Sequence, residues 1–322
     1  HITLIDLNAS IGRVDGGIGL TLKEPGFHIT ADRSDTPGEV TVTSESAGGP
    51  AYIERMRKSA AALLTDMDAD MSGVGGIRIH ITHDAPPHVG LGSGTQCALA
   101  AGMAVNHLYN LGLSVRDIAI KSGRGGTSGI GVASFESGGF ILDGGHRFSE
   151  KGAFKPSAAS RSPPAPILFQ RPFPGWEVVL AIPDARGAYD DNEVDIFKQE
   201  CPIPISEVQE LSHIILMETL PAVVEEDIES FGDSINRIQK TGFKRREISL
   251  QRPEIRQMIE LMQENTCGAG MSSFGPVVYG ITDNKRDADH AACLAREFLD
   301  ATTGGCSTIT HASNSGADVK HI

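Results

Sequence analysis

A short glycine-rich stretch has the residue types that bind phosphate. It reads Gly90-Leu91-Gly92-Ser93-Gly94 and stands between an alternating strand pattern and a helix-forming stretch, 96–110. Glycine lets the backbone approach a ligand closely, and the free N–H groups at the start of the next helix favour negative charge. We therefore expect phosphate or pyrophosphate to bind at Gly90, Gly92, Ser93, Gly94 and Thr95.

The spacing of this loop differs from the two best-known phosphate motifs. No Lys-Ser/Thr pair follows at the distance found in nucleoside-triphosphate loops, and the glycines do not spell the G-x-G-x-x-G of dinucleotide-binding folds. A turn that merely packs a helix on a sheet therefore stays an alternative for this loop taken alone. A second small-residue loop, Gly268 to Pro276, precedes a strand pattern and adds Gly270, Ser272 and Ser273 as candidate phosphate-binding residues.

The charge balance limits the kind of partner. Lys plus Arg number 28 and Asp plus Glu 41, which gives a formal net charge of −13. A general nucleic-acid binder needs a basic face, so nucleic acid is not an expected partner. No apolar run approaches the roughly 18 residues of a membrane span, and 5 cysteines without a C-x-x-C pair are typical of a reducing compartment. We expect a cytoplasmic protein that binds anionic small molecules through a few local donors.

The elements that must position these loops follow from hydrophobic periodicity. In the first half, the pattern predicts strands at 1–7, 18–22, 27–31, 40–43 and 77–82. Helical patterns cover 50–70 and 96–110, and Ser114 is the expected N-cap of a shorter helix. The second half alternates strands at 176–182, 271–281 and 307–311 with helices at 205–220, 222–240, 253–265 and 286–300.

Three segments between these elements are predicted to be irregular. They are a polar, glycine-rich turn at 12–17, an acidic loop at 183–195 and a Pro/Ser/Ala-rich linker at 151–166. The linker divides the chain into a domain of residues 1–165 and a domain of residues 166–322. The order of helices and strands indicates an α+β fold.

Together, the two glycine loops resemble those of the GHMP kinase superfamily, which includes galactokinase, homoserine kinase and mevalonate kinase. Its second motif, P-x-x-x-G-L-G-S-S, is matched by Pro86 or Pro87 and by Gly90 to Gly94, and its third motif by Gly268 to Pro276. The resemblance covers most of the chain. It implies an N-terminal domain of the ribosomal-S5 type, a ferredoxin-like C-terminal domain, and an active site in the cleft between them.

The sequence departs from the kinase pattern at the position of the catalytic carboxylate. Many of these kinases carry P-S-G-x-D, whose Asp acts on the hydroxyl that accepts phosphate. Here Thr127-Ser128-Gly129-Ile130-Gly131 aligns with that motif, so glycine stands where the Asp would be. Glycine cannot accept a proton, which argues against ordinary phosphorylation, although homoserine kinase also lacks this Asp. The second Ser of G-L-G-S-S is likewise replaced, by Gly94.

The N-terminal run resembles one non-kinase branch of the superfamily, the β-ribofuranosylaminobenzene 5′-phosphate synthases. The similarity lies in residues 1–8, in Gly12 to Leu20, and in Gly90 to Gln96, where kinases have Ser-Ser-Ala. It implies a phosphoribosyl transferase that joins ribose C1 of phosphoribosyl pyrophosphate to the ring of 4-aminobenzoate or 4-hydroxybenzoate. CO₂ and pyrophosphate would be released, in methanopterin biosynthesis. The alternatives are an ATP-dependent small-molecule kinase of the same fold and a non-catalytic binding module.

Such a reaction needs donors for a departing polyanion and a group that faces positive charge at ribose C1. The candidates for catalysis are Arg13, Asp15 and Asp184. Arg13 would hold a phosphate or the aromatic carboxylate, and Asp15 would stabilise positive charge at C1 or hold Mg²⁺. An Arg–Asp pair that braces a turn is the alternative for both. Asp184 and Arg186 fall in a loop that could close the cleft, and a solvated loop explains them equally well.

Resemblance to the kinases also implies Mg²⁺ as a cofactor, with Ser93 and Asp15 as its expected ligands. Arg124 is the candidate for binding the 5′-phosphate, again with a solvated loop as the alternative. The expected partners are the two small-molecule substrates and a second copy of the chain, because dimers are common in the family.

Three histidines invite a zinc interpretation. His80, His83 and His88 lie within nine positions, but alternation separates the first two on their strand and no fourth ligand is evident. We therefore favour His88 as a residue that lines the cleft. Cys97 is expected in the core, and Met258 and Met262 are expected on the buried face of their helix.

Overall fold

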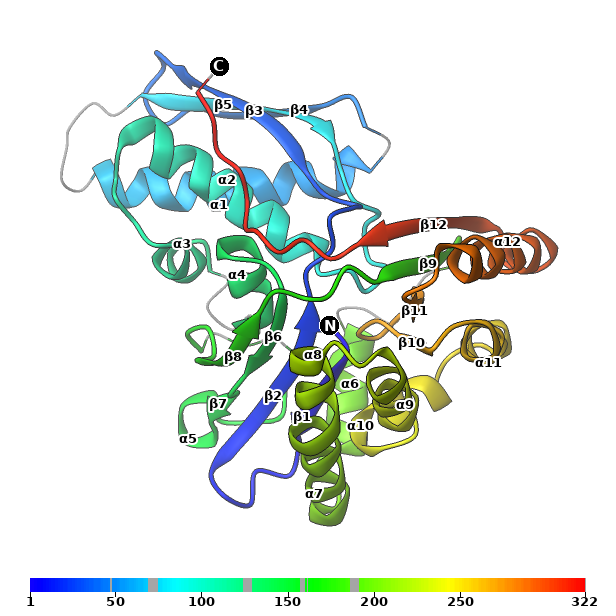
Figure 1. Ribbon diagram of the computed structural model, residues 1–322. Coiled ribbons are helices and arrows are strands. Elements are labelled where there is room, and N and C mark those ends of the chain that lie inside the picture. The colour runs from blue at the N-terminus through cyan, green and yellow to red at the C-terminus, as the bar shows by residue number, and fades with distance from the viewer. Residues whose placement is uncertain are drawn as a thin grey trace.

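The computed structural model describes residues 1–46, 48–68, 75–123, 129–156, 160, 162–185 and 191–321. Figure 1 shows three sheets with helices packed around them, which confirms the α+β class. The predicted roles of Arg124 and Arg186 concern positions outside the described residues.

The first sheet has β2 (Arg13–Leu20) near its centre. β2 pairs antiparallel with β1 (Thr3–Asp6) on one side and with β6 (Phe140–Asp143) on the other, and β6 pairs antiparallel with β8 (Ile167–Arg171). The short strand β7 (His146–Arg147) pairs with the start of β2. Residues from the first and middle parts of the chain therefore meet on β2 (Figure 1).

The second sheet and two long helices form the part of the molecule drawn at the top of Figure 1. Its order is β3 (His28–Ser34), β5 (Gly76–His83) and β4 (Val40–Ser44), and β4 runs parallel to β5. α1 (Gly49–Asp68) and α2 (Ser93–Tyr109) pack on one face through a shared apolar core. The predicted core position of Cys97 is confirmed, since its exposed fraction is 0%.

The third sheet is antiparallel throughout and has the order β10 (Gly268–Met271), β11 (Val278–Thr282), β9 (Glu177–Pro183), β12 (Gly305–His311). α11 (Pro253–Asn265) and α12 (Lys285–Ala301) cover one face. Met258 and Met262 lie fully buried on α11, as predicted. The other described helices are α3 (Val115–Lys121), α4 (Gly129–Glu136), α5 (Phe148–Lys151), α6 (Asp191–Glu200), α7 (Ile205–Ile214), α8 (Leu220–Glu225), α9 (Ile228–Ile238) and α10 (Gly242–Ser249).

Alternate residues of β9 enter two different cores, which explains why this strand is buried along its length. Val179 and Ala181 pack toward α11 and α12. Val178, Leu180 and Ile182 belong to a second core, which also contains residues of α9 and of β1 and β2. This second core joins the two halves of the chain, so a site between them is held by packed elements on both sides.

Several predicted boundaries are wrong, for local reasons. Residues 13–17 belong to β2 rather than to a turn: Asp15 and Gly16 have positive φ (70° and 65°) and bend the strand without ending it. α2 begins at Ser93 rather than at Gln96. The acidic loop is shorter than predicted because α6 begins at Asp191. By contrast, the predicted cap at Ser114 is confirmed as a capping box with Asp117.

The second half is also divided more finely than the periodicity indicated. The helix predicted at 205–220 changes to a π-helical turn at Ile215–Thr219 before α8. The single strand predicted at 271–281 is the β10–β11 hairpin. The boundary after residue 165 stays a prediction; β8, which follows it, pairs with β6 of the first sheet, so the crossing to the third sheet comes after Arg171.

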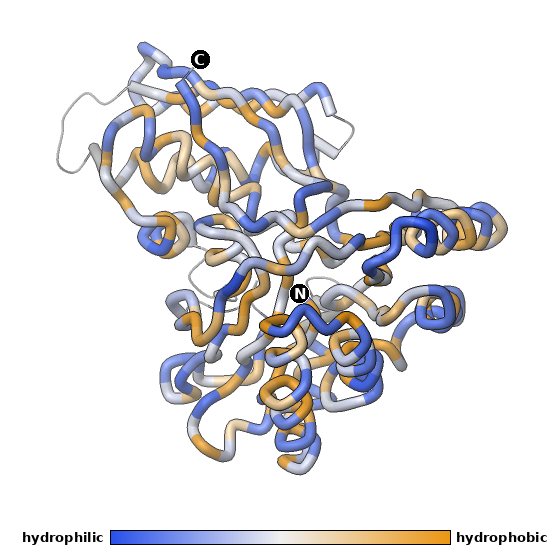
Figure 2. The backbone as a smooth tube through the Cα atoms, in the orientation of Figure 1, coloured by the Kyte–Doolittle hydropathy of each residue, from blue (hydrophilic) through white to orange (hydrophobic). Residues whose placement is uncertain are grey.

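The distribution of apolar residues follows the packing. In Figure 2, hydrophobic and hydrophilic residues alternate along the outer helices α7, α11 and α12, as expected of helices with one buried face. No helix in the described part of the chain has the length and apolar composition needed to cross a membrane.

Candidate active site

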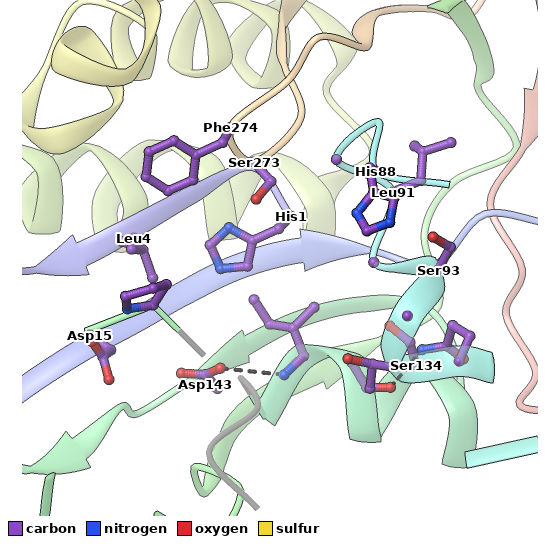
Figure 3. A pocket seen from close by; sticks show the side chains of 18 of the residues that line it. His1, Leu4, Asp15, His88, Leu91, Ser93, Ser134, Asp143, Ser273 and Phe274 are labelled. Atoms are coloured by element: carbon purple, nitrogen blue, oxygen red, sulfur yellow. Dashed lines mark hydrogen bonds between the residues drawn. The ribbon is translucent and has the colours of Figure 1, made fainter. Parts of the chain in front are cut away.

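A cavity of about 300 Å³ lies where the two halves of the chain meet. Its walls come from β1 and β2, the segment 88–96, α4, and the turn at Ser273 to Gly275. Figure 3 shows His88, Leu91 and Ser93 at one end, Asp15 and Leu4 toward the other, and Asp143 along the wall.

The glycine loop forms the first end of the cavity. Gly90 and Gly92 have φ of 92° and 69°, and a Cβ on Gly90 would overlap the Ser272 carbonyl oxygen. Gly92 is the N-cap of α2 and supplies no side-chain cap. The first N–H groups of this helix to donate within it are those of Thr95 and Gln96, both to the Gly92 carbonyl. The amides before them, those of Ser93 and Gly94, precede the first acceptor within the helix, and both residues line the cavity, which suits an anion.

The second small-residue loop supports the first one. The Ser272 hydroxyl donates to the Gly90 carbonyl oxygen at 2.9 Å, and Ser273 lines the cavity with a positive φ of 50°. Gly270 does not line the cavity: it lies in β10 against Gln239, where a Cβ would overlap the amide. Of the predicted phosphate-binding set, the structure therefore brings together Gly90 to Thr95 and Ser273, with Ser272 as a support.

Arg55 was missed by the sequence analysis. It projects from α1 to line the cavity beside the loop, and a Cβ at position 94 would overlap its guanidinium group. The glycine that replaces the second Ser of the kinase motif thus makes room for a cation at the start of α2. Nothing in the sequence separates Arg55 from the neighbouring Arg57, which is exposed and paired with Glu54.

A buried cluster of charges forms the other end. Asp15 Oδ2 accepts hydrogen bonds from Lys151 Nζ at 2.6 Å and from His146 Nδ1 at 2.7 Å. The side chain of Lys151 is 2% exposed and that of Asp15 10%. His146 Nε2 lies 3.1 Å from the Pro163 carbonyl oxygen, so both ring nitrogens have a polar partner. The predicted carboxylate is in the cavity, but its partners come from 131 and 136 residues away.

Asp143 is a second buried carboxylate in the cavity wall and was also missed. Its Oδ1 accepts the N–H of Gly145 at 3.0 Å and its Oδ2 the N–H of Ile130, at the start of α4, at 3.3 Å (dashed line in Figure 3). Burial raises the pKa of Asp143 to about 6, and the two backbone hydrogen bonds oppose that rise. Within the described ranges, no cation pairs with it.

A third buried carboxylate, Glu247, supports the Ser273 turn. Lys244 Nζ lies 2.5 Å from Glu247 Oε2 and donates to the Ser273 carbonyl oxygen at 2.8 Å. Both side chains are buried, and desolvation raises the pKa of Glu247. Leu4, Phe197 and Phe274 add an apolar wall close to this turn and to Asp15.

Two predicted catalytic residues do not line the cavity. The Arg13 guanidinium donates to the carbonyl oxygens of Gly144 and Gly145, both at 2.9 Å, and so braces the connection between β6 and β7. The alternative of a bracing role therefore describes Arg13, although its partners are carbonyls and not Asp15. Asp184 is exposed at the end of β9, where its N–H donates to the Gly304 carbonyl oxygen.

The donor set does not fit a magnesium site built from side chains. Asp15 already accepts from Lys151 and His146 through Oδ2, and the ammonium group of Lys151 would repel a metal ion bound beside it. Across the described positions, no three His, Cys, Asp or Glu side chains gather at a possible metal site. Ser93 lines the cavity, but no carboxylate is within hydrogen-bond distance of it among the interactions of the described residues. His80 and His83 pair instead with Glu45 and Glu24, while His88 lines the cavity as expected.

Comparisons with known proteins agree on the fold and the family. Models of the GHMP kinases N-terminal domain and of the GHMP kinases C-terminal domain match residues 52–139 and 219–300. A mevalonate kinase from L. major in complex with R-mevalonate superposes with a TM-score of 0.65 at 16% identity, covering 94% of this chain and 91% of that one. A homoserine kinase from Cytophaga hutchinsonii gives 0.63 at 15%, covering 93% and 90%. The fold is thus the two-domain GHMP type.

Relatives of higher sequence identity indicate a more specific family within the GHMP fold. A β-ribofuranosylphenol 5′-phosphate synthase from Archaeoglobus fulgidus is 46% identical over 321 residues, 99% of this chain and 96% of the relative. One from Methanothermobacter thermautotrophicus is 46% identical over 291 residues, 88% and 87% of the two chains. A homoserine kinase from Methanocella arvoryzae is 22% identical over 299 residues, 91% and 88% of the two chains. The chain belongs to the family of β-ribofuranosylphenol 5′-phosphate synthases.

Proposed function

We propose that this chain joins C1 of phosphoribosyl pyrophosphate to the ring carbon that carries the carboxylate of a 4-substituted benzoate. The acid is 4-hydroxybenzoate or 4-aminobenzoate, and CO₂ and pyrophosphate are released, in methanopterin biosynthesis. The single observation that carries the proposal is the cavity with an anion-binding helix start at one end and buried carboxylates at the other. Many kinases of this fold place an Asp beside the acceptor hydroxyl, and the position aligned with that Asp is Gly131 in the same wall.

In this proposal the pyrophosphate binds at the start of α2. The amides of Ser93 and Gly94 and the guanidinium of Arg55 face the charge that develops as the C1–O bond breaks. A guanidinium is well suited to this task because its fork of donors matches phosphate oxygens. The predicted contact of Arg124 with the 5′-phosphate remains part of the proposal, and Lys155, which lines the far end, is a second donor for that group.

The acceptor lies against the apolar wall of Leu4, Phe197 and Phe274. Loss of pyrophosphate leaves an oxocarbenium-like ribose, and the carboxylate of Asp15 in the cavity wall is the group assigned to stabilise its positive charge. The ring carbon then attacks C1, and departure of CO₂ restores aromaticity. An apolar wall favours that last step because it desolvates the carboxylate that is lost.

The magnesium predicted from the sequence belongs, in this proposal, to the incoming phosphoribosyl pyrophosphate. Ser93 is the residue that would contact it, and no step is assigned to a metal held by the protein. A homodimer remains a prediction.

The experiment supplies phosphoribosyl pyrophosphate with carboxyl-labelled 4-hydroxybenzoate or 4-aminobenzoate and measures labelled CO₂ and pyrophosphate. We expect both products in equal amounts, and only when both substrates are present. A parallel incubation with ATP and homoserine or mevalonate measures ADP. ADP without labelled CO₂ would favour the kinase alternative, and binding of phosphoribosyl pyrophosphate without turnover of either acid would favour the non-catalytic module.

A further inference from the structure

Three buried carboxylates line the cavity, and two of them are neutralised by cations. Asp15 is held by Lys151 and His146, and Glu247 by Lys244. A carboxylate that already accepts from a buried ammonium group is a weak base. Asp143 is the remaining one: both of its hydrogen bonds come from backbone N–H groups, while nearby His146 lowers its pKa and nearby Asp15 raises it without a direct contact.

Two hydrogen bonds fix the orientation of the Asp143 carboxylate and leave some of its acceptor positions unused. One oxygen is tied to Gly145 and the other to the start of α4, so the carboxylate plane cannot rotate freely. Its exposed fraction is 3%, and Figure 3 places its side chain in the cavity wall between those of Asp15 and Ser134. A carboxylate has about four acceptor positions, so it can accept a further hydrogen bond from a ligand. The environment therefore suits a neutral donor that enters with the substrate.

We propose that Asp143 accepts the proton of the para-hydroxyl of the aromatic acid and thereby makes the site selective for the hydroxy acid over the amino acid. This inference rests on the proposed function and names the substrate class of the same cavity. The name of the relatives, which refers to a ribosylated phenol, is consistent with it.

The step balances as follows. The bond between C1 and the pyrophosphate oxygen breaks and its electron pair leaves with pyrophosphate. The ring carbon forms the new bond to C1, the O–H pair moves toward the ring as a C=O bond, and the proton passes to Asp143. The bond to the carboxylate then breaks, its electron pair restores the aromatic ring, CO₂ departs, and the oxygen recovers its proton from Asp143.

An amino group in the para position needs a base less than a hydroxyl group does. Its nitrogen can carry positive charge in the intermediate without losing a proton, whereas a hydroxyl oxygen must give up its proton. Removing the base should therefore harm the hydroxy acid more than the amino acid. General-base catalysis typically contributes about 10²- to 10⁴-fold, which sets the scale of the difference.

The test measures kcat/KM for 4-hydroxybenzoate and 4-aminobenzoate in Asp143→Asn. We expect a loss of roughly 100-fold or more for the hydroxy acid and less than roughly 10-fold for the amino acid. The matched control is Asp6→Asn: Asp6 also accepts two backbone N–H groups, from Asn8 and Ala9, but does not line the cavity. The ratio of the two kcat/KM values should not change in this control. Equal losses for both acids in Asp143→Asn would overturn the inference and leave the proposed function intact.

A second measurement needs no variant and so does not depend on folding. In the unmodified protein, the ratio of kcat/KM for the hydroxy acid to that for the amino acid should fall as pH drops through about 6, where Asp143 becomes protonated. Asp15, His146 and Lys151 face the same end of the cavity from β2, β7 and α5, and the ratio removes any effect that they have equally on both acids. A ratio that is constant with pH would overturn the inference. Absence of turnover with both acids would instead refute the proposed function.

Discussion

The two ends of the cavity are built in different ways. The α2 end consists of consecutive residues with small side chains that line the cavity at the start of a helix, with one added cation, Arg55. The opposite end consists of Asp15, Asp143, His146 and Lys151, buried charges that reach each other through hydrogen bonds and long-range pairing of strands. A helix start can bind an anion with little effect on the free energy of unfolding. Buried charges at the opposite end lower that free energy unless they are paired with opposite charges.

The largest expected effect is on stability and lies at the buried end. Asn in Asp15→Asn keeps the shape and tolerates the positive φ, but it leaves Lys151 without its counter-charge. Breaking a buried pair typically costs about 3–5 kcal/mol. Urea unfolding should show a loss of about 3 kcal/mol or more in the free energy of unfolding. The control, Asp184→Asn, changes an exposed carboxylate and should lie within about 0.5 kcal/mol of the unmodified protein; similar losses in both variants would contradict the compensation described for this end.

The next effect lies at the α2 end and concerns binding. Arg55→Ala removes a cation from the proposed pyrophosphate site, and a hydrogen bond to a charged group is worth about 1.5–3 kcal/mol. We expect KM for phosphoribosyl pyrophosphate to rise roughly 10- to 100-fold, with the free energy of unfolding nearly unchanged. Arg57→Ala, on the same helix but paired with Glu54 at the surface, is the matched control. If the two variants give equal KM values, Arg55 has no part in the site.

A smaller effect concerns how the free energy of unfolding depends on pH, which should reflect the buried end of the cavity. Burial raises the pKa of Asp143 from the ordinary 3.8 to about 6, so the folded protein binds this proton more tightly than the unfolded chain does. The stability that this group contributes is fully present below about pH 4 and is lost as pH rises through about 6. Between about pH 4.5 and pH 7.5, the unmodified protein should lose about 2 kcal/mol relative to Asp143→Asn. A pH-independent difference in their urea midpoints would show that burial of Asp143 carries no such cost.

The smallest effect tests why the loop differs from the kinase pattern. In Gly94→Ser the new side chain overlaps the guanidinium of Arg55, which is flexible and can move aside at modest cost. KM for phosphoribosyl pyrophosphate should rise by roughly 3- to 10-fold, about 1 kcal/mol in binding. In the Arg55→Ala background the same substitution should have no further effect. An equal effect in both backgrounds would mean that Gly94 serves a purpose other than admitting Arg55.

The difference between the two ends of the cavity also explains which site residues could be predicted from the sequence. The glycine loop was predicted because its residues are adjacent and its φ values require glycine, as at Gly90 and Gly92. The GHMP-type fold followed from the same motifs. Asp15 was found because it stands near glycines, although its segment is a bent strand and not a turn.

The other features of the site could not be predicted in this way, because they depend on contacts between distant parts of the chain. Lys151 lies at the start of the predicted linker, and only the folded chain buries it against Asp15. Asp143 did give a signal, an acid that ends the apolar run Phe140-Ile141-Leu142, because an acid in such a run must find partners when buried. Arg55 gave none, since an arginine on an amphipathic helix is ordinarily a surface residue. Arg13 was chosen by its spacing, but its guanidinium braces two carbonyls.

The central claim is that both ends of the cavity serve one reaction, which forms a carbon–carbon bond. The most direct measurement uses phosphoribosyl pyrophosphate labelled with ¹³C at C1 and 4-hydroxybenzoate labelled with ¹³C at the carbon that bears the carboxylate, and records the NMR spectrum of the product. We predict a one-bond ¹³C–¹³C coupling between ribose C1 and the ring, with the carboxylate lost as CO₂. A product joined through the hydroxyl oxygen, or unchanged substrates, would contradict the account.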